Sequence, residues 1–227
     1  LYAYEAGQPA VGDLFNYSKL HAPKTIIDKA QEKDIPILEY LECLASNIAV
    51  EDQHGVILDW FNGNHSILSD SHLSGSIFGL TLHTPYEMIH RAYIEATAFG
   101  TKMIMKQFED NQIPVHTVYA SGGIPQKSKL LVEIYANILN KKVVVLESSN
   151  ATALGAAMLG ANVGNAYETL QEAANHMKQP IAYIKEPEPK KVQAYQCWCN
   201  PNKIFGVFNF NHRSLKIITK YILWYQF

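Results

Sequence analysis

The spacing of apolar and polar positions predicts alternating helices and strands over residues 1–188. Helical spacing of apolar residues predicts helices over about 36–50, Thr84 to Asp110, Lys127 to Asn140, Thr152 to Asn162 and Tyr167 to Met177. Short apolar or β-branched runs predict strands at Gly55 to Phe61, Val115 to Ala120 and Lys142 to Glu147. This order is typical of an α/β fold with a mainly parallel sheet covered by helices.

The longest predicted helix carries two local signals. Thr84-Pro85-Tyr86-Glu87 resembles a helix start, with Thr84 as the N-cap and Pro85 at the first helical position. Gly100 lies inside the same helix, where glycine lowers helix stability. We expect Gly100 to mark a site of close packing rather than a break.

Composition and charge narrow the class of protein. The chain has 227 residues, of which 48% are hydrophobic and 18% charged, so disorder is excluded and a packed core is expected. A formal net charge of −2 gives no electrostatic argument for nucleic acid. With no long uncharged apolar run, we predict no membrane helix. Three cysteines are too few for a disulfide scaffold, which favours reduced thiols and a cytoplasmic location.

The end of the chain differs from the rest. No Asp or Glu follows Glu188, and the last stretch is rich in aromatic and basic residues. We predict a boundary near Pro189, with residues 1–188 as one domain and 189–227 as an atypical tail, either a natural extension or foreign or mistranslated sequence. Cys197 and Cys199 with His212 lack zinc spacing and a fourth ligand, so no metal site is predicted. Because the chain begins at Leu1 rather than Met, a fragment of something longer is one interpretation.

The segment Ala120-Ser121-Gly122-Gly123 directly follows a predicted strand. In open α/β sheets, ligands bind outside the carboxyl ends of the strands. Two adjacent glycines permit positive φ and leave backbone amides free to approach a phosphate. Lys127 follows near the start of the next predicted helix. The pattern predicts either a nucleotide phosphate site or a plain turn.

A helix of small residues, Asn150 to Ala161, follows the next predicted strand. Its small side chains allow it either to pack closely on a sheet or to leave a slot for a flat ring. Neither a Walker loop nor a Rossmann fingerprint occurs, and no G-x-S-x-G elbow supports a hydrolase. Any phosphate cradle is therefore of another design. Near the start of the chain, Glu5 and Asp13 could hold sugar hydroxyls or be solvated loop charges.

Several ordered strings resemble the FGGY carbohydrate kinases. Gly75-x-Ile77-x-Gly79-Leu80, Arg91-Ala92 and Glu95-Ala96 look like the second signature of that family. Within the family, the strings are most similar to the bacterial members that phosphorylate L-ribulose. The strings are Tyr4 to Asp13, Leu58 to Asn64, Glu95 to Gly100, Gly122 to Lys127 and Ala153 to Met158. The resemblance covers about residues 1–190.

The resemblance implies a fold and a reaction. Such kinases have two actin-like, ribonuclease-H-like domains with the active site in the cleft between them. They use ATP and Mg²⁺ to phosphorylate a sugar hydroxyl. This chain is then the C-terminal, nucleotide-holding domain, with a mixed sheet covered by helices. Its partners are L-ribulose, ATP and the missing N-terminal domain, and a homodimer is possible. Its product is L-ribulose 5-phosphate, in L-arabinose catabolism.

The resemblance also assigns residues. It implies that Ser121, Gly122 and Gly123 line the triphosphate, with Lys127 and Ser128 nearby. The remaining contacts are Gly155 and Ala156 at the adenosine, and Glu5 and Gln8 at the sugar. Ser128 stands where the family commonly has Asn, which weakens the case for a side-chain contact there. The base, the first phosphate loop and the Mg²⁺-holding acids lie upstream of the position matching Leu1, so no catalytic residue is expected in this chain.

Three other interpretations stay open from the sequence. The chain could be a non-catalytic ATP- or sugar-binding fragment. It could be an actin-like ATPase, which would hydrolyse ATP without a sugar. Within the family, it could belong to a member acting on another sugar such as xylulose or on glycerol, although those lack the Tyr4 to Asp13 string.

Overall fold

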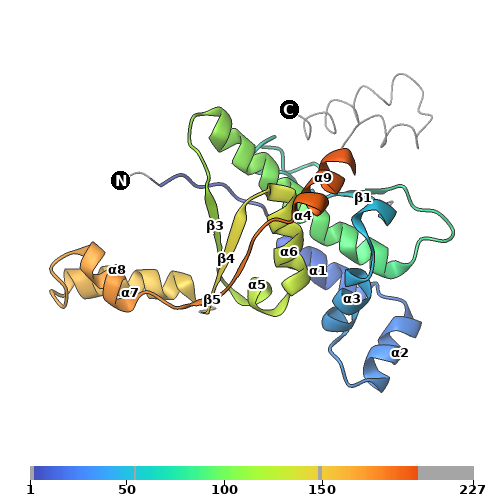
Figure 1. The fold of residues 1–227 in the computed structure, drawn as a ribbon, viewed down its shortest axis with the longest axis horizontal. Helices are drawn as coiled ribbons and strands as arrows, with labels where there is room; N and C mark the ends of the chain where they lie inside the picture. Colours follow the sequence, from blue (N-terminus) through green and yellow to red (C-terminus); the bar gives the residue numbers. More distant parts are fainter. Residues whose placement is uncertain (1–2, 54, 148–149, 199–227) are drawn as a thin grey trace.

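The computed structural model describes residues 3–53, 55–147 and 150–198, and Figure 1 shows the arrangement of their helices and strands. The elements, in chain order, are α1 Val11–Leu20, α2 Lys24–Glu32, α3 Ile37–Ser46, the 3₁₀ helix η1 Val50–Asp52, β1 Val56–Leu58, β2 Ser76–Phe78, α4 Tyr86–Asp110, β3 Thr117–Ala120, α5 Gly123–Lys127, α6 Lys129–Leu139, β4 Lys142–Leu146, α7 Ala151–Val163, α8 Leu170–Met177, β5 Ile181–Lys185 and α9 Pro189–Trp198. Most of the predicted tail, with Cys199 and His212, lies outside the described residues.

Helix α4 runs through the middle of the domain and contacts α1, α3 and α6 (Figure 1). The helix begins one residue later than predicted, because Pro85 is the N-cap and Tyr86 is the first helical residue. Thr84 does not cap the helix. Its Oγ1 accepts a hydrogen bond from the Thr81 amide at 2.9 Å, so the hydroxyl serves the preceding turn instead.

The main sheet has the order β3-β4-β5 and is mixed rather than mainly parallel. Strands β3 and β4 are parallel, whereas β4 and β5 are antiparallel. Strand β5 runs antiparallel to β4 because the helical hairpin α7–α8 returns the chain to the end of the sheet at which β4 finishes. There the Glu147 amide donates to the Pro180 carbonyl at 3.1 Å. A separate antiparallel pair, β1 and β2, lies at the other side of α4.

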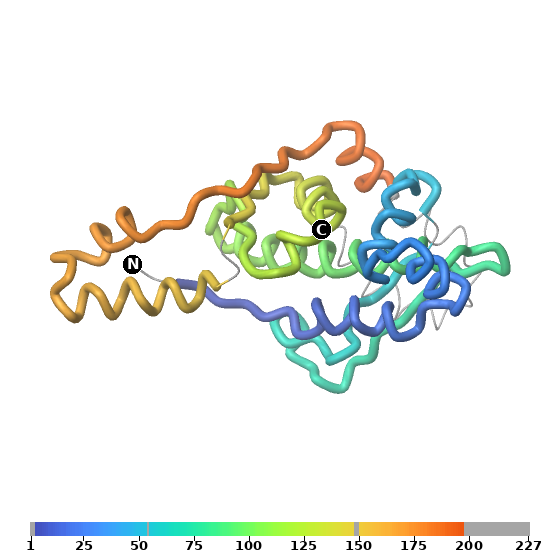
Figure 2. Tube along the Cα trace, turned by 90° about the horizontal axis from the view of Figure 1, so that it is seen from below, coloured from blue at the N-terminus to red at the C-terminus, as the bar shows by residue number. Residues whose placement is uncertain are grey.

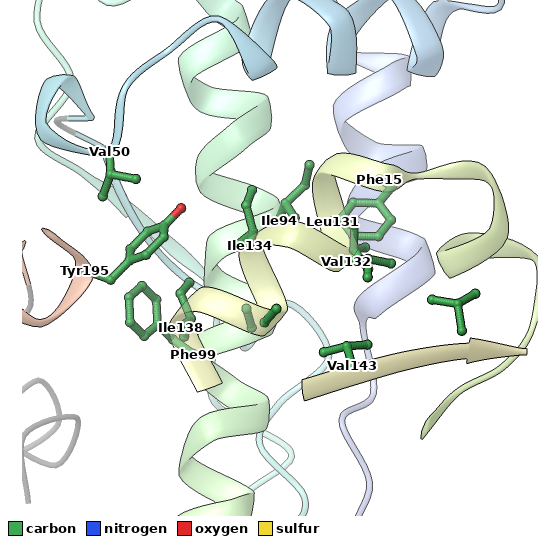
Figure 3. Packing of buried hydrophobic residues seen from close by; sticks show 13 residues of the cluster. Phe15, Val50, Ile94, Phe99, Leu131, Val132, Ile134, Ile138, Val143 and Tyr195 are labelled. Carbon is green, nitrogen blue, oxygen red and sulfur yellow. The ribbon is translucent and has the colours of Figure 1, made fainter. Parts of the chain in front are cut away.

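The largest hydrophobic core lies between α4 and the sheet, with α6 at its centre (Figure 3). Ile94 and Phe99 of α4 face Ile134 and Ile138 of α6 across this core. Tyr195 of α9 belongs to the same cluster, is 2% exposed, and makes an edge-on contact with Phe99. Residues 189–198, the first part of the predicted tail, therefore form helix α9 and pack on the domain through Tyr195.

The predicted helix from Lys127 to Asn140 is divided in two. Helix α5 ends at Lys127, and Ser128 adopts an extended conformation before α6 begins. The hydroxyl of Ser128 accepts a hydrogen bond from the Leu131 amide at 3.1 Å. This is an N-cap, which satisfies a backbone donor that the first helical turn would otherwise leave unpaired. The division places α5 as a separate short turn at the end of β3.

Helices α7 and α8 form a hairpin that projects away from the sheet (Figure 2). None of the described residues of α7 is buried, and a Cβ at Gly155 or Gly160 would meet no atom within 4 Å. The interpretation of this helix as one packed on the sheet is therefore wrong for this structure. Uncharged, mostly small side chains occupy every side of α7. The helix therefore has no single apolar face that would direct it against the sheet. No described helix is long and apolar enough to cross a membrane.

Candidate functional site

The ends of strands β3 and β4 meet at one edge of the sheet. The two strands are parallel, and Ala120 lies opposite Val145. The segment after β3 and the start of α7 after β4 therefore leave the sheet on the same side. Gln126 of α5 ties the two together, because its side-chain amide donates to the carbonyls of Leu146 at 3.1 Å and Glu147 at 2.6 Å.

The paired glycines after β3 border open space. Gly122 has φ +99° and ψ 176°, a conformation that only glycine adopts without strain, which confirms the expected positive φ. A Cβ at Gly122 or Gly123 would meet no atom within 4 Å. Ser121 and Gly123 are exposed. No side chain among the described residues therefore covers this loop, which meets the first geometric requirement of a phosphate cradle.

A cavity of about 300 Å³ lies beneath this loop. Ser121 and Gly122 form part of its rim, and Thr101 of α4 reaches its wall. Most of its lining is apolar and comes from β3, β4, α5, α6 and the start of α1: Val11, Val118, Ala120, Ile124, Pro125, Leu131, Val132, Tyr135 and Val143. Through Val11 the cavity also borders the start of α1.

Lys127 and Ser128 differ in their availability. Lys127 is exposed at the end of α5, four residues beyond Gly123. Ser128 is 4% exposed and caps α6. Its hydroxyl also hydrogen-bonds Glu42; burial raises the pKa of that carboxyl, and the Ser128 bond opposes the rise. A nucleotide contact by Ser128 stays a prediction, with its hydroxyl already engaged inside the fold.

Gly155 and Ala156, the residues expected at the adenosine, lie on the projecting helix α7. Ala156 is exposed and Gly155 is partly exposed. The surface beside Gly155 is open, since a Cβ built there would meet no other part of the chain within 4 Å. The adenosine role of these two residues stays a prediction.

The two residues expected at the sugar lie in the segment before α1 and have different environments. Glu5 is exposed. Gln8 is engaged inside the domain: its amide nitrogen donates to Asp59 Oδ2 at 2.5 Å and to the Thr97 carbonyl at 2.9 Å. Its amide oxygen accepts from the Thr101 hydroxyl at 2.9 Å. In the structure Gln8 therefore binds neighbouring residues, and direct contact with a sugar is untested.

Asp59 lies in the string Leu58 to Asn64 that resembles the family, but no site role was predicted for it from the sequence. It follows β1 directly, is 7% exposed, and its Oδ1 has no hydrogen-bond partner among the described residues. Burial raises the pKa of Asp59, and the hydrogen bond from Gln8 opposes the rise. The signal in the sequence was a carboxylate inside the apolar run Gly55 to Phe61.

Two residues of the string that resembles the family signature form a buried ion pair away from this edge of the sheet. Arg91 Nε donates to Glu95 Oε1 at 2.8 Å, one turn apart on α4. Arg91 also donates to the carbonyls of Ala45 and Ile48, which joins α4 to the end of α3. Burial raises the pKa of Glu95, and the Arg91 guanidinium opposes the rise. The pair stabilises the scaffold rather than the open loop.

The described residues offer no set of ligands for Mg²⁺. No group of three or more His, Cys, Asp or Glu side chains that could hold a metal ion occurs among them. Magnesium is usually held by one or two carboxylates together with substrate phosphates.

Comparison with known sequences identifies close relatives. A ribulokinase of Staphylococcus epidermidis is 80% identical over 196 residues, which cover 86% of this chain and 37% of that protein. Ribulokinase 1 of Staphylococcus saprophyticus is 70% identical over 195 residues, or 86% of this chain and 36% of that protein. The chain therefore spans about 37% of the length of the curated relatives that it matches.

Solved structures share the fold at low identity. A xylulose kinase from Rhodospirillum rubrum superposes with a TM-score of 0.66 at 21% identity, covering 93% of this chain and 39% of that chain. A glycerol kinase from Plasmodium falciparum, solved with ADP, superposes with a TM-score of 0.59 at 21% identity, covering 80% of this chain and 36% of that chain. The fold is that of the actin-like sugar kinases.

The family follows from a match to most of the chain. Residues 1–163 match the sequence model described as the FGGY family of carbohydrate kinases, C-terminal domain. The matched range includes the glycine loop, Asp59, the buried ion pair and all of α7. On this evidence the chain belongs to the FGGY family of carbohydrate kinases and contains the family's C-terminal domain.

Proposed function

We propose that this chain is the nucleotide-holding C-terminal part of a cytoplasmic kinase that transfers phosphate from ATP to L-ribulose and forms L-ribulose 5-phosphate, a step of L-arabinose catabolism. The observation that carries the proposal is the glycine loop, where Gly122 at φ +99° and Gly123 border open space at the carboxyl edge of the sheet. The choice of L-ribulose is supported by the 80% identity to a ribulokinase.

The nucleotide would lie across the edge shared by β3 and β4. The amides of Ser121, Gly122 and Gly123 would donate to the triphosphate, because backbone N–H groups in such a loop form an anion-binding concavity. The exposed ammonium of Lys127 would add a mobile positive charge, and Ser128 would hold the start of α6. Gly155 and Ala156 would contact the adenosine, with open space beside Gly155 to receive it.

The sugar would bind near Glu5, which is exposed beside the domain in the N-terminal segment. Its carboxylate would accept hydrogen bonds from sugar hydroxyls, and Gln8 would support the same segment. Phosphoryl transfer depends mainly on positioning and on stabilising charge. In this proposal the chain binds and orients both substrates. The proton acceptor and the Mg²⁺-holding acids come from the region that this chain lacks and its longer relatives have. We therefore expect the chain alone to be inactive.

Nucleotide binding by the 227-residue chain is the first test. ATP affinity measured by calorimetry should fall by at least about 10-fold in Gly123→Asp, because a carboxylate would occupy the space and repel the phosphates. Thr25→Asp adds the same charge to an exposed position on α2 and should bind ATP like the unmodified chain. Equal affinity in Gly123→Asp and the unmodified chain would place the nucleotide elsewhere.

Activity is the second test. It uses a chimaera in which the part of the S. epidermidis ribulokinase that lies before the matched region is joined to residue 1 of this chain. The chimaera should phosphorylate L-ribulose in preference to D-xylulose and glycerol, and the 227-residue chain should phosphorylate none of them. A preference for D-xylulose or glycerol would overturn the choice of sugar. ATP hydrolysis unaffected by any sugar would favour an actin-like ATPase instead.

A further inference from the structure

The side chain of Gln8 is held at both ends by groups from two different elements. Its nitrogen donates to Asp59 Oδ2 and the Thr97 carbonyl, and its oxygen accepts from the Thr101 hydroxyl. Asp59 follows β1, whereas Thr97 and Thr101 lie one turn apart on α4. Gln8 is therefore fixed between the end of a strand and the central helix.

Gly100 leaves the space in which Gln8 and Asp59 meet. A Cβ at position 100 would lie 2.5 Å from Asp59 Oδ2 and would also collide with the Gln8 amide nitrogen. Any other residue at this point of α4 would separate the two side chains or displace the helix. In a helix interior, glycine is less favourable than alanine by about 1 kcal/mol. At position 100 this cost is offset because the missing side chain leaves room for the contact between Gln8 and Asp59.

The backbone beside Gln8 is fixed as well. The Gly7 amide donates to Ser66 Oγ at 2.6 Å, and the Ser66 hydroxyl donates back to the Gly7 carbonyl at 2.7 Å. Glu5 lies two residues before Gly7 and is exposed. The position of the Glu5 carboxylate therefore depends on how firmly Gly7 and Gln8 are held.

Asp59 is an unusual group for this place, because an unpaired buried carboxylate oxygen is unfavourable. Its Oδ1 has no partner among the described residues. Asp59 lines a cavity of about 20 Å³ together with Gly7, Asn64 and Ser66. That volume suits about one water molecule and is too small for a sugar. No metal-binding group of three occurs in the described part of the chain. The contact that remains to explain the carboxylate is the one to Gln8.

We propose that Asp59 is a positioning residue for the sugar end of the site, which fixes Gln8 between β1 and α4 and thereby holds Glu5 at the substrate. The proposal rests on the function proposed above. Asp59 does not touch the sugar; it acts through Gln8. This role requires a side-chain oxygen that accepts a hydrogen bond from the Gln8 amide. Asparagine at position 59 should therefore keep the role, and alanine should lose it.

Kinetics of the chimaera described above test this role. Asp59→Ala should raise the KM for L-ribulose by on the order of 10-fold, the effect of losing one hydrogen bond to a charged group, with the KM for ATP within about 2-fold. Asp59→Asn should restore most of the affinity for L-ribulose. Asp28→Ala, at an exposed position on α2, is the matched control and should change neither constant.

The pairing itself is tested in the 227-residue chain, without any activity. Unfolding by urea of Asp59→Ala, Gln8→Ala and the double variant should show that the two changes are not additive, as expected for residues in contact. Additive effects would overturn the proposal, and so would equal increases in both KM values or an Asn variant as impaired as the Ala variant. If the unmodified chimaera did not phosphorylate L-ribulose, the proposed function would be refuted. The interaction free energy between Asp59 and Gln8 would still be measured by urea unfolding of the 227-residue chain.

Discussion

The hydroxyl of Tyr195 donates to Oε1 of Glu95 at 2.9 Å, although the two residues are 100 positions apart in the chain. The same hydroxyl accepts from Arg91 Nη2 at 3.0 Å. Glu95 is 2% exposed, and burial raises the pKa of the Tyr195 phenol. Helix α9 is thus joined to α4 by a buried polar contact as well as by the packing of Tyr195 on Phe99.

Removing that hydroxyl should destabilise the domain. Tyr195→Phe keeps the packing but leaves Arg91 and Glu95 each with one partner fewer, so the free energy of unfolding should fall by about 1–3 kcal/mol. Urea unfolding would measure the change. Tyr119→Phe on β3, where the side chain is 66% exposed, should cost much less. Equal losses in the two variants would mean that the hydroxyl of Tyr195 contributes nothing beyond its ring.

Two helical glycines should respond oppositely to alanine. Gly100→Ala would place a Cβ 2.5 Å from Asp59 Oδ2, so it should cost about 1–3 kcal/mol of stability despite the gain in helix propensity. Gly160→Ala on α7, with no atom within 4 Å of the new Cβ, should stabilise by about 0.5–1 kcal/mol. Thermal unfolding of both variants decides the matter, and a neutral Gly100→Ala would contradict the crowding seen here.

The two glycines of the loop after β3 should also differ. Gly122→Ala forces a residue with a Cβ into φ +99°, which costs on the order of 1–3 kcal/mol or changes the loop conformation. Its ATP affinity should fall with it. Gly123→Ala adds a methyl group to open space at an ordinary φ and should leave the fold intact. Calorimetric titration with ATP and thermal unfolding of each variant would reveal the difference; matching behaviour would argue against a conformational need at position 122.

Mild acid should weaken the fold through His90. This histidine is 1% exposed, its Nδ1 lies 2.9 Å from Ser18 Oγ, and burial lowers its pKa from 6.5 to about 4. Between these values the unfolded chain binds a proton that the folded chain does not. Stability is therefore full above about pH 6.5 and falls as the pH drops toward 4, by on the order of 3 kcal/mol.

The contribution of His90 is isolated by comparison with a variant. Buried acids such as Asp59 and Glu42, whose pKa values are raised, have the opposite slope above their usual values, so the unmodified chain alone is not diagnostic. His90→Gln should unfold in urea with a weaker pH dependence between 4 and 6.5. An NMR titration of His90 that gave an ordinary pKa would refute the prediction.

The sequence by itself determined the elements that carry strong local patterns, together with the family. Three features could be predicted because each lies within a short stretch of sequence: the apolar stripe of α4, the β-branched runs of β3 and β4, and the glycine pair after β3. The glycine pair also indicated that positive φ was permitted in this loop, but the structure was needed to show that Gly122 adopts it.

Only the tertiary structure decided the sheet and the contacts within the site. Strand β5 is largely exposed and weakly patterned, and its antiparallel direction depends on the return of the chain through α7 and α8. The link from Gln8 to Asp59 joins residues 51 positions apart, and the one from Tyr195 to Glu95 joins residues 100 apart. Such pairs leave no periodic trace in the sequence, because their partners meet only when separate elements pack around α4.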